Sequence, residues 1–138
     1  MPTISTKKQL EDYINAQFKK ALVTGKNAQN VVIETGKKHV QEDVYDVYTP
    51  AVYERTGKLK EDWEVKEIAN GIEIGNTRSE NGKDIVDTIE YGRNYDYEFE
   101  YSDTPRPFIE NTREELRNSN ELLEALKKDM KSIGLDVK

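Results

Sequence analysis

The sequence contains no cysteine and a single histidine, His39. Without cysteine the chain can form no disulfide, has no thiol nucleophile and offers no thiolate to a metal, which suits a reducing cytosol. A single histidine excludes a histidine-rich metal site, and its position inside a helical lysine cluster argues against a histidine-based catalytic triad. Because His39 lies within a lysine cluster on a helical pattern, we expect it on the surface of a helix.

Long apolar runs and hydrolase or nucleotide-binding motifs are missing as well. No apolar stretch approaches the ~20 residues needed to cross a bilayer, and Met1-Pro2-Thr3 does not begin a signal peptide, so we expect a soluble protein. No Gly-x-Ser-x-Gly elbow or Walker-type loop occurs. Carboxylates such as Asp96, Glu98 and Glu100 are ligands that a hard cation prefers, but no Asp-x-Asp-x-Asp-Gly pattern accompanies them.

Charged residues are plentiful, at 35% of the chain, and unevenly distributed. Residues 1–40 hold seven lysines and three acids, whereas the whole chain has a net charge of −6. An acidic total argues against tight duplex binding, because affinity for DNA comes mainly from neutralising phosphates. A basic N-terminal part and an acidic remainder permit head-to-tail self-association. Lysines that are merely solvated on an exposed helix are the alternative; those in question include Lys19, Lys20, Lys37 and Lys38.

Apolar residues at helical spacing predict an N-terminal helical region over residues 1–48. Thr6 and Gln9 fit a capping box at its start, and an apolar stripe runs from Leu10 to Val47. One unbroken helix from about Thr6 to Tyr48 would measure roughly 65 Å at ~1.5 Å per residue, which is too long for so small a domain to cover.

We therefore expect part of this helix to find a partner, or the helix to break. Gly25 is the predicted break, because glycine costs about 1 kcal/mol relative to alanine inside a helix. Gly36 lies on the same stripe and is expected to mark close packing against another element.

The stretch from Trp63 to Ile74 predicts a β-hairpin, because Asn70-Gly71 separates two runs of alternating character. A type I′ turn needs positive φ at both central residues, which asparagine tolerates and glycine adopts freely. One face of the hairpin is expected to bury Trp63, Val65, Ile72 and Ile74, while Glu64, Lys66 and Glu73 face water.

Two further strands are predicted in a sheet region of residues 60–101, after a loop at 76–84. Ile85–Tyr91 is rich in β-branched residues and predicts a third strand. Tyr91–Tyr101 alternates aromatic and acidic residues at the period of a strand. It is either an amphipathic edge strand or a docking surface, with Tyr95, Tyr97, Phe99 and Tyr101 on one face and Asp96, Glu98 and Glu100 on the other.

Residues 105–133 predict a C-terminal helix. Pro107 suits its first position, and Gly134 is a plausible stop. Asn118-Ser119-Asn120 weakens the middle and can divide the helix in two. Together these patterns predict a single α+β domain over residues 1–138, with a long N-terminal helix, a small antiparallel sheet of three to four strands, and the C-terminal helix packed on the sheet.

Three short motifs then occur in an order shared with one family of proteins: Tyr53 with Arg55-Thr56-Gly57-Lys58-Leu59, Glu90-Tyr91-Gly92, and Arg106-Pro107-Phe108-Ile109. With the helix that precedes them, they make the chain similar to the bacteriophage tail-component family. These are the tail-completion, head–tail joining or neck proteins of phages with long, non-contractile tails. The resemblance spans nearly the whole chain, but the acidic, tyrosine-rich insert between Gly92 and Pro105 departs from it.

The resemblance implies a structural virion protein at the head–tail junction, assembled in the host bacterial cytoplasm as a ring, with a hexamer suggested by the family. It implies no catalytic residue, no cofactor, no metal and no membrane. The implied partners are copies of itself, other neck and tail proteins, and DNA that passes without specific binding along an acidic lumen, for which the acidic residues of the insert are candidates.

The motif residues can also have purely structural roles. Gly57 and Gly92 are expected to meet backbone requirements, and Phe108 is expected in the core. Arg55 and Thr56 are either a loop with a strand-entry cap or a subunit contact. The alternatives for the whole chain are a head-closure or adaptor protein of the same junction, a host-encoded interaction module, and a metal-dependent enzyme.

Overall fold

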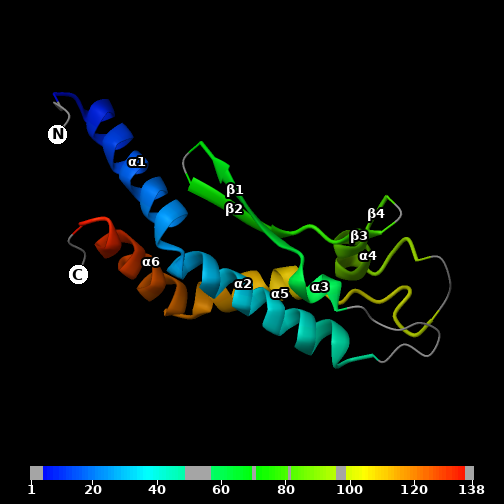
Figure 1. Ribbon diagram of the computed structural model, residues 1–138. Coiled ribbons are helices and arrows are strands. Elements are labelled where there is room, and N and C mark those ends of the chain that lie inside the picture. Colours follow the sequence, from blue (N-terminus) through cyan, green and yellow to red (C-terminus); the bar gives the residue numbers. More distant parts are fainter. Residues whose placement is uncertain (1–4, 49–56, 70, 81, 96–98, 136–138) are drawn as a thin grey trace.

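The computed structural model describes residues 5–48, 57–69, 71–80, 82–95 and 99–135 (Figure 1). Its elements are α1 (Lys7–Gly25), α2 (Asn27–His39), the π-helix η1 (Val40–Tyr45), α3 (Lys58–Glu61), β1 (Trp63–Ile68), β2 (Gly71–Asn76), β3 (Ser79–Glu80), β4 (Lys83–Asp84), α4 (Ile85–Tyr91), α5 (Phe108–Asn118) and α6 (Glu121–Ser132). The predicted α+β class is confirmed. None of the described helices is both long and apolar enough to cross a membrane.

The N-terminal helical region breaks where the sequence predicts. Thr6 and Gln9 form the predicted capping box, each side chain bonding the other residue's backbone amide. α1 ends at Gly25, and Lys26 adopts a left-handed conformation with φ of 66°. α2 then runs off in a different direction, so that α1 projects from one end of the elongated molecule (Figure 1).

The hairpin forms with a turn one position earlier than predicted. Ile68 lies opposite Gly71, so the two intervening residues are Ala69 and Asn70. Gly71 belongs to β2, where it is buried against α1 with Leu22 near it. The register therefore moves by two residues, which leaves every side chain on its predicted face. Half-buried positions are Trp63, Val65, Ile72 and Ile74; exposed ones are Glu64, Lys66 and Glu73.

Ile85–Tyr91, predicted as a third strand, is the helix α4. The Asp84 carboxylate accepts a hydrogen bond from the Asp87 amide at 3.0 Å and so caps the first turn. Gly92 ends the helix with φ of 64°. These end signals, together with burial of Ile89 in the core, outweigh the β-branched composition.

The fourth predicted strand is absent from the described residues of its range, 92–95 and 99–101. Phe99 instead accepts a backbone hydrogen bond from Ser102 at 3.1 Å, so the chain turns there. The segment predicted as a loop at 76–84 contains β3 and β4, which pair with each other. The described strands thus form two separate pairs rather than one sheet of three to four strands.

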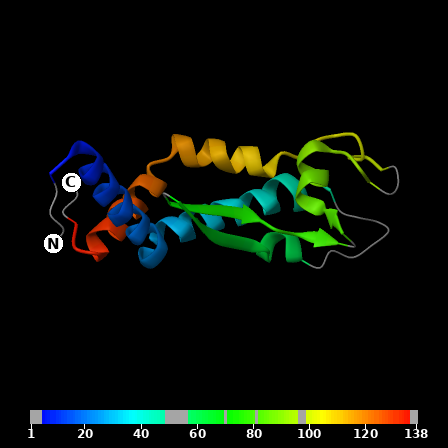
Figure 2. The same ribbon diagram turned by 90° about the horizontal axis from the view of Figure 1, so that it is seen from above.

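The C-terminal helical region divides as the sequence allows, and α5 and α6 meet at Ser119-Asn120. Gly134 follows the end of α6 with φ of 93°, as predicted. α5 begins at Phe108, so Pro107 is its cap rather than its first residue. α6 packs on α1 and α2, and α5 packs on α2 and η1, so the predicted packing of the C-terminal helix on the sheet is wrong. Figure 2 shows this helical layer from above.

The main core lies where η1, α3, α4 and α5 meet. It consists of Val40, Val44, Leu59, Ile89 and Phe108, and Phe108 is fully buried as predicted. Gly36 brings α2 against β1: a Cβ on Gly36 would lie 2.4 Å from the Trp63 ring. The predicted close packing at Gly36 is therefore confirmed, and it fixes the hairpin along α2.

Candidate assembly surface

The first half of α1 extends beyond the body of the protein. Residues 7–12 and 14–16 are all exposed, whereas Ala21 in the second half is fully buried. The apolar stripe continues outward from Ala21 to Ile14 and Leu10, which are 54% and 45% exposed. The second half packs on α6 and β2. One helix therefore carries a buried stripe at one end and an exposed stripe at the other.

The direction of α1 is fixed at its joint with α2 by Asp129 of α6. This carboxylate is fully buried. One oxygen accepts from the backbone amide of Asn27 at 2.8 Å and from its side-chain amide at 2.9 Å, and the other accepts from the Ala28 amide at 2.8 Å. An anion at the first amides of a helix meets unpaired N–H groups and the positive end of the helix dipole. α6 thus caps α2 from about a hundred residues away.

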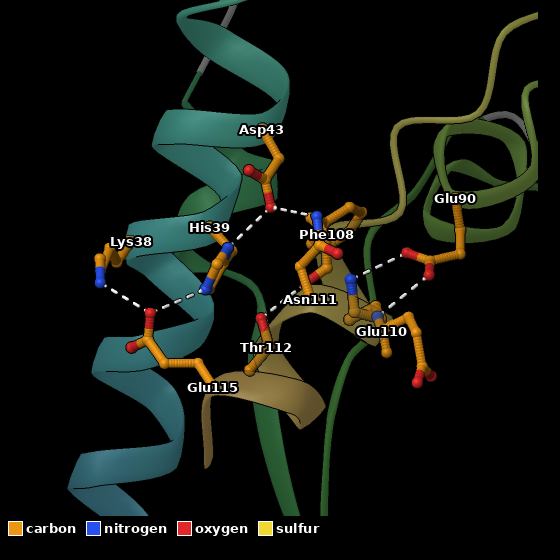
Figure 3. A network of polar contacts seen from close by, with 10 residues as sticks. Lys38, His39, Asp43, Glu90, Phe108, Glu110, Asn111, Thr112 and Glu115 are labelled. Carbon is orange, nitrogen blue, oxygen red and sulfur yellow. Dashed lines mark hydrogen bonds and ion pairs between the residues drawn. The ribbon is translucent and has the colours of Figure 1, made fainter. Parts of the chain in front are cut away.

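A polar network joins the end of α2 to α5 (Figure 3). The His39 ring lies between two carboxylates, with Nδ1 2.7 Å from Asp43 and Nε2 3.2 Å from Glu115. Asn111 donates to the same Asp43 oxygen at 3.0 Å, and Lys38 donates to the same Glu115 oxygen at 2.7 Å. A ring protonated on both nitrogens donates to both carboxylates, whereas a neutral ring turns a lone pair toward one of them. His39 lies on a helix, as the sequence predicts, but its side chain is 12% exposed and bridges two carboxylates instead of facing solvent.

This network shifts two ionisation equilibria. The hydrogen bond from Lys38 lowers the pKa of Glu115 below its ordinary 4.5, and the His39 contact acts in the same direction against partial desolvation. The same hydrogen bond raises the pKa of Lys38 above 10.5. Both groups are thereby held in their charged forms. The contact lies beside the π-helix η1, a helical irregularity that occurs often at functional sites.

Glu90 of α4 caps α5 as Asp129 caps α2. The Glu90 side chain is buried, and its oxygens accept from the backbone amides of Ile109 at 2.8 Å and Glu110 at 3.1 Å (Figure 3). α5 has no cap from its own preceding residue, since Pro107 offers no side-chain acceptor. The position of α5 therefore depends on α4, within the motif Glu90-Tyr91-Gly92.

Arg106 connects the tyrosine-rich segment to the start of α5. Its guanidinium is buried, lies 5.1 Å from the ring centre of Tyr101 and 6.0 Å from that of Phe99, and donates to the Tyr95 hydroxyl at 3.0 Å. Its Nε is buried without a hydrogen-bond partner. Of the aromatic residues proposed from the sequence as a docking surface, Tyr95, Phe99 and Tyr101 thus lie around an arginine of the same chain, half-buried rather than freely presented.

The remaining sequence-predicted residues lie in several places. Tyr53, Arg55, Thr56, Asp96, Tyr97 and Glu98 are outside the described residues. Gly57 caps α3 with φ of 78°, Leu59 is buried, and Tyr91 and Glu100 are exposed. Gly92 is required by its positive φ and by space, since a Cβ there would lie 2.5 Å from the Thr104 carbonyl carbon.

The four candidate lysines do not gather at one site. Lys37 contacts Glu34 and Glu61, Lys38 contacts Glu115, and Lys19 and Lys20 lie on the packed half of α1. Within the described part of the chain, no cluster of three or more histidine and acidic side chains is arranged to hold a metal ion.

Sequence reasoning missed the buried carboxylates Asp129 and Glu90. A signal was present, since Asp129 follows Leu122 and Ala125 on the packed face of α6, where an acid is unexpected. Its partners could not be named, because the amides it caps lie in another helix.

These contacts define an α+β protein built as a helical frame, in which buried or bridging polar side chains set the helix directions and one helix end projects. The chain belongs to the YomN family, whose model matches residues 6–132. It is 42% identical over 112 residues to the SPbeta prophage-derived uncharacterized protein YomN of Bacillus subtilis (strain 168), which covers 79% of this chain and 80% of the relative. No solved structure matches the chain. The phage origin predicted from the sequence is thereby supported.

Proposed function

We propose that this protein is a structural component of a phage particle, acting at the head–tail junction as a tail-completion or neck protein, and that it catalyses no reaction. The observation that carries the proposal is the exposed first half of α1, with Leu10 and Ile14 continuing a stripe that is buried further along the helix. The prophage-derived relative and the three sequence motifs support the setting in a phage particle.

In this proposal the free end of α1 docks on the next copy of the chain. A contact between two different surfaces generates a ring when the rotation closes. The apolar side chains give the contact its affinity. The basic N-terminal part facing the acidic remainder of the next copy orients the approach and makes assembly sensitive to salt.

The same charge distribution suits a passage for DNA. Acidic side chains on the lumen side of the ring repel phosphates, so the genome moves through without binding. The other partners are neck and tail proteins stacked above and below the ring.

Electron microscopy of particles made without this protein tests the proposal. We expect full heads beside unattached tails, with joining restored when the protein is added back. Heads that lose their DNA would assign it to head closure at the same junction. Intact, infectious particles in its absence would contradict a structural role at the junction.

A further inference from the structure

The joint between α1 and α2 exchanges the backbone hydrogen bonds of one helix for side-chain bonds. In an uninterrupted helix the Asn27 amide would donate to the Val23 carbonyl, four residues earlier. Here Asp129 accepts from that amide at 2.8 Å, while the Gln29 side-chain amide donates to the carbonyls of Leu22 at 2.7 Å and Val23 at 3.4 Å. Side chains thus satisfy both the backbone amide after the break and the backbone carbonyls before it. In a continuous helix most of these amides and carbonyls would bond to one another.

The bent form also carries a backbone penalty. Lys26 is a non-glycine residue with φ of 66°, a conformation that L side chains seldom adopt. Gly25 is required only by the bent form, because a Cβ there would lie 2.3 Å from the Asp129 carboxylate. In a straight helix the same Cβ would stabilise the structure, because alanine has a higher helix propensity than glycine.

The pattern of apolar residues fits both forms. Ala21 and Ala28 are buried on either side of the break, and the stripe they belong to continues through it at helical spacing. The exposed first half of α1 has little packing that would oppose a change of direction. The second half packs on α6 and β2, so straightening the helix exchanges this packing, together with the Asp129 cap, for the backbone bonds of a continuous helix.

We propose that the joint at Gly25–Lys26 is a two-state hinge. In the bent state Asp129 of α6 caps α2. In the straight state α6 has released this cap, and residues 7–39 form one continuous helix. The chain itself supplies both the latch, Asp129, and the continuous helix that forms when it opens. This inference concerns the isolated chain and does not rest on the proposed function.

Electron–electron distance measurement between two nitroxide labels tests the hinge. The chain has no cysteine, so cysteines introduced at the exposed positions Lys8 and Asn30 are labelled uniquely. In one straight helix these positions are separated by about 33 Å. The wild-type background is expected to give a shorter principal distance, from the bent form.

Three variants move the equilibrium in known directions. Asp129→Ala removes the cap and Gly25→Ala displaces it, so each is expected to raise the population near 33 Å at least several-fold with no loss of helical circular dichroism. Lys26→Gly relieves the left-handed residue and is expected to remove any such population. Glu124→Ala, an exposed acid on the same helix as Asp129, is the matched control and should leave the distances unchanged.

The hinge is refuted if Asp129→Ala and Gly25→Ala both keep the single shorter distance, since the bend would then be fixed by packing alone. Loss of helical signal in both variants without a peak near 33 Å would also refute it, because release of the cap would then unfold the joint instead of straightening it.

Discussion

Two buried carboxylates, Asp129 and Glu90, each hold the first amides of a helix that is distant in sequence. Most helices are capped by the residue just before them. Here the cap comes from another helix, so each bond both satisfies a helix end and fixes the angle between two elements. Loss of one of these carboxylates is therefore expected to change the angle between two helices as well as the stability of one helix end.

The Glu90 cap predicts a large effect of one substitution. Glu90→Ala leaves two amides at the start of α5 without their acceptor, in a place that water reaches poorly. We expect a loss of about 3 kcal/mol in the free energy of unfolding, measured by urea denaturation. Glu90→Gln keeps one acceptor and should lose less. Glu114→Ala, an exposed acid on α5, is the control, and an equal loss there would contradict the capping role.

Gly36 gives a second prediction at this scale. Alanine favours a helix by about 1 kcal/mol over glycine, but its Cβ would lie 2.4 Å from the Trp63 ring. We expect the clash to dominate, with a net loss of about 2 kcal/mol and a shifted emission of Trp63, the single tryptophan. Gly75→Ala, where the new Cβ meets no described atom within 4 Å outside its chain neighbours, should change stability by less than about 0.5 kcal/mol.

At the scale of elements, the contact between α2 and α5 depends on charge. Glu115, Lys38, His39 and Asp43 form a continuous chain of hydrogen bonds and ion pairs across the helix interface (Figure 3). Side chains in such a chain reinforce one another, because each fixes the orientation of the next. The register of α5 on α2 is thus set by polar contacts as well as by the buried Phe108.

This network predicts a loss of stability in acid. The pKa of Glu115 is lowered in the folded state by the Lys38 hydrogen bond, so the unfolded chain binds its proton more readily. The stabilisation is present above the ordinary value of 4.5 and is lost as the pH falls through the lower folded value.

Urea unfolding of wild type and Glu115→Gln from pH 7 to pH 3 measures this effect. The wild type should be the more stable protein at pH 7, and the difference should shrink below about pH 4.5. The matched variant Glu114→Gln should run parallel to the wild type. A difference between wild type and Glu115→Gln that is constant down to pH 3 would show that the charge of Glu115 plays no part.

At the scale of the whole molecule, the frame is elongated and leaves half of one helix uncovered (Figures 1 and 2). The buried half of α1 is held by α6 and β2, while Leu10 and Ile14 are exposed and meet no equivalent surface within the described part of the chain. In the proposed ring, these two residues lie at the centre of the contact between neighbouring copies.

Leu10→Ser combined with Ile14→Ser is therefore expected to block self-association without unfolding the monomer. Removing two apolar side chains weakens each contact by about 2 kcal/mol, or roughly 30-fold in dissociation constant. Size-exclusion chromatography with light scattering at increasing salt measures it, with the wild type shifting toward monomer as salt rises. Leu123→Ser, an equally exposed leucine on α6, is the control. A wild type that stays monomeric at high concentration and low salt would contradict assembly through this surface.

Much of the fold was predictable because its signals are local. The capping box at Thr6, the break at Gly25, the close packing at Gly36 and the division at Ser119-Asn120 each depend on a few neighbouring residues. The hairpin was also predictable, because a register shift of two residues leaves each side chain on the same face of the two strands. The strand predicted at Ile85–Tyr91 failed because β-branched residues were weighed above the end signals of Asp84 and Gly92.

The sequence by itself thus determined the α+β class, the start of α1, the breaks at Gly25 and Ser119-Asn120, and the face that the hairpin buries, because these depend on chemistry within one or two turns of the chain. Only the tertiary structure decided that Asp129 caps α2, that Glu90 caps α5, and that His39 bridges Asp43 and Glu115. The reason is physical: an acceptor and the amides it satisfies need to be close in space, and nothing in their separate local sequences records which helix end each carboxylate will meet.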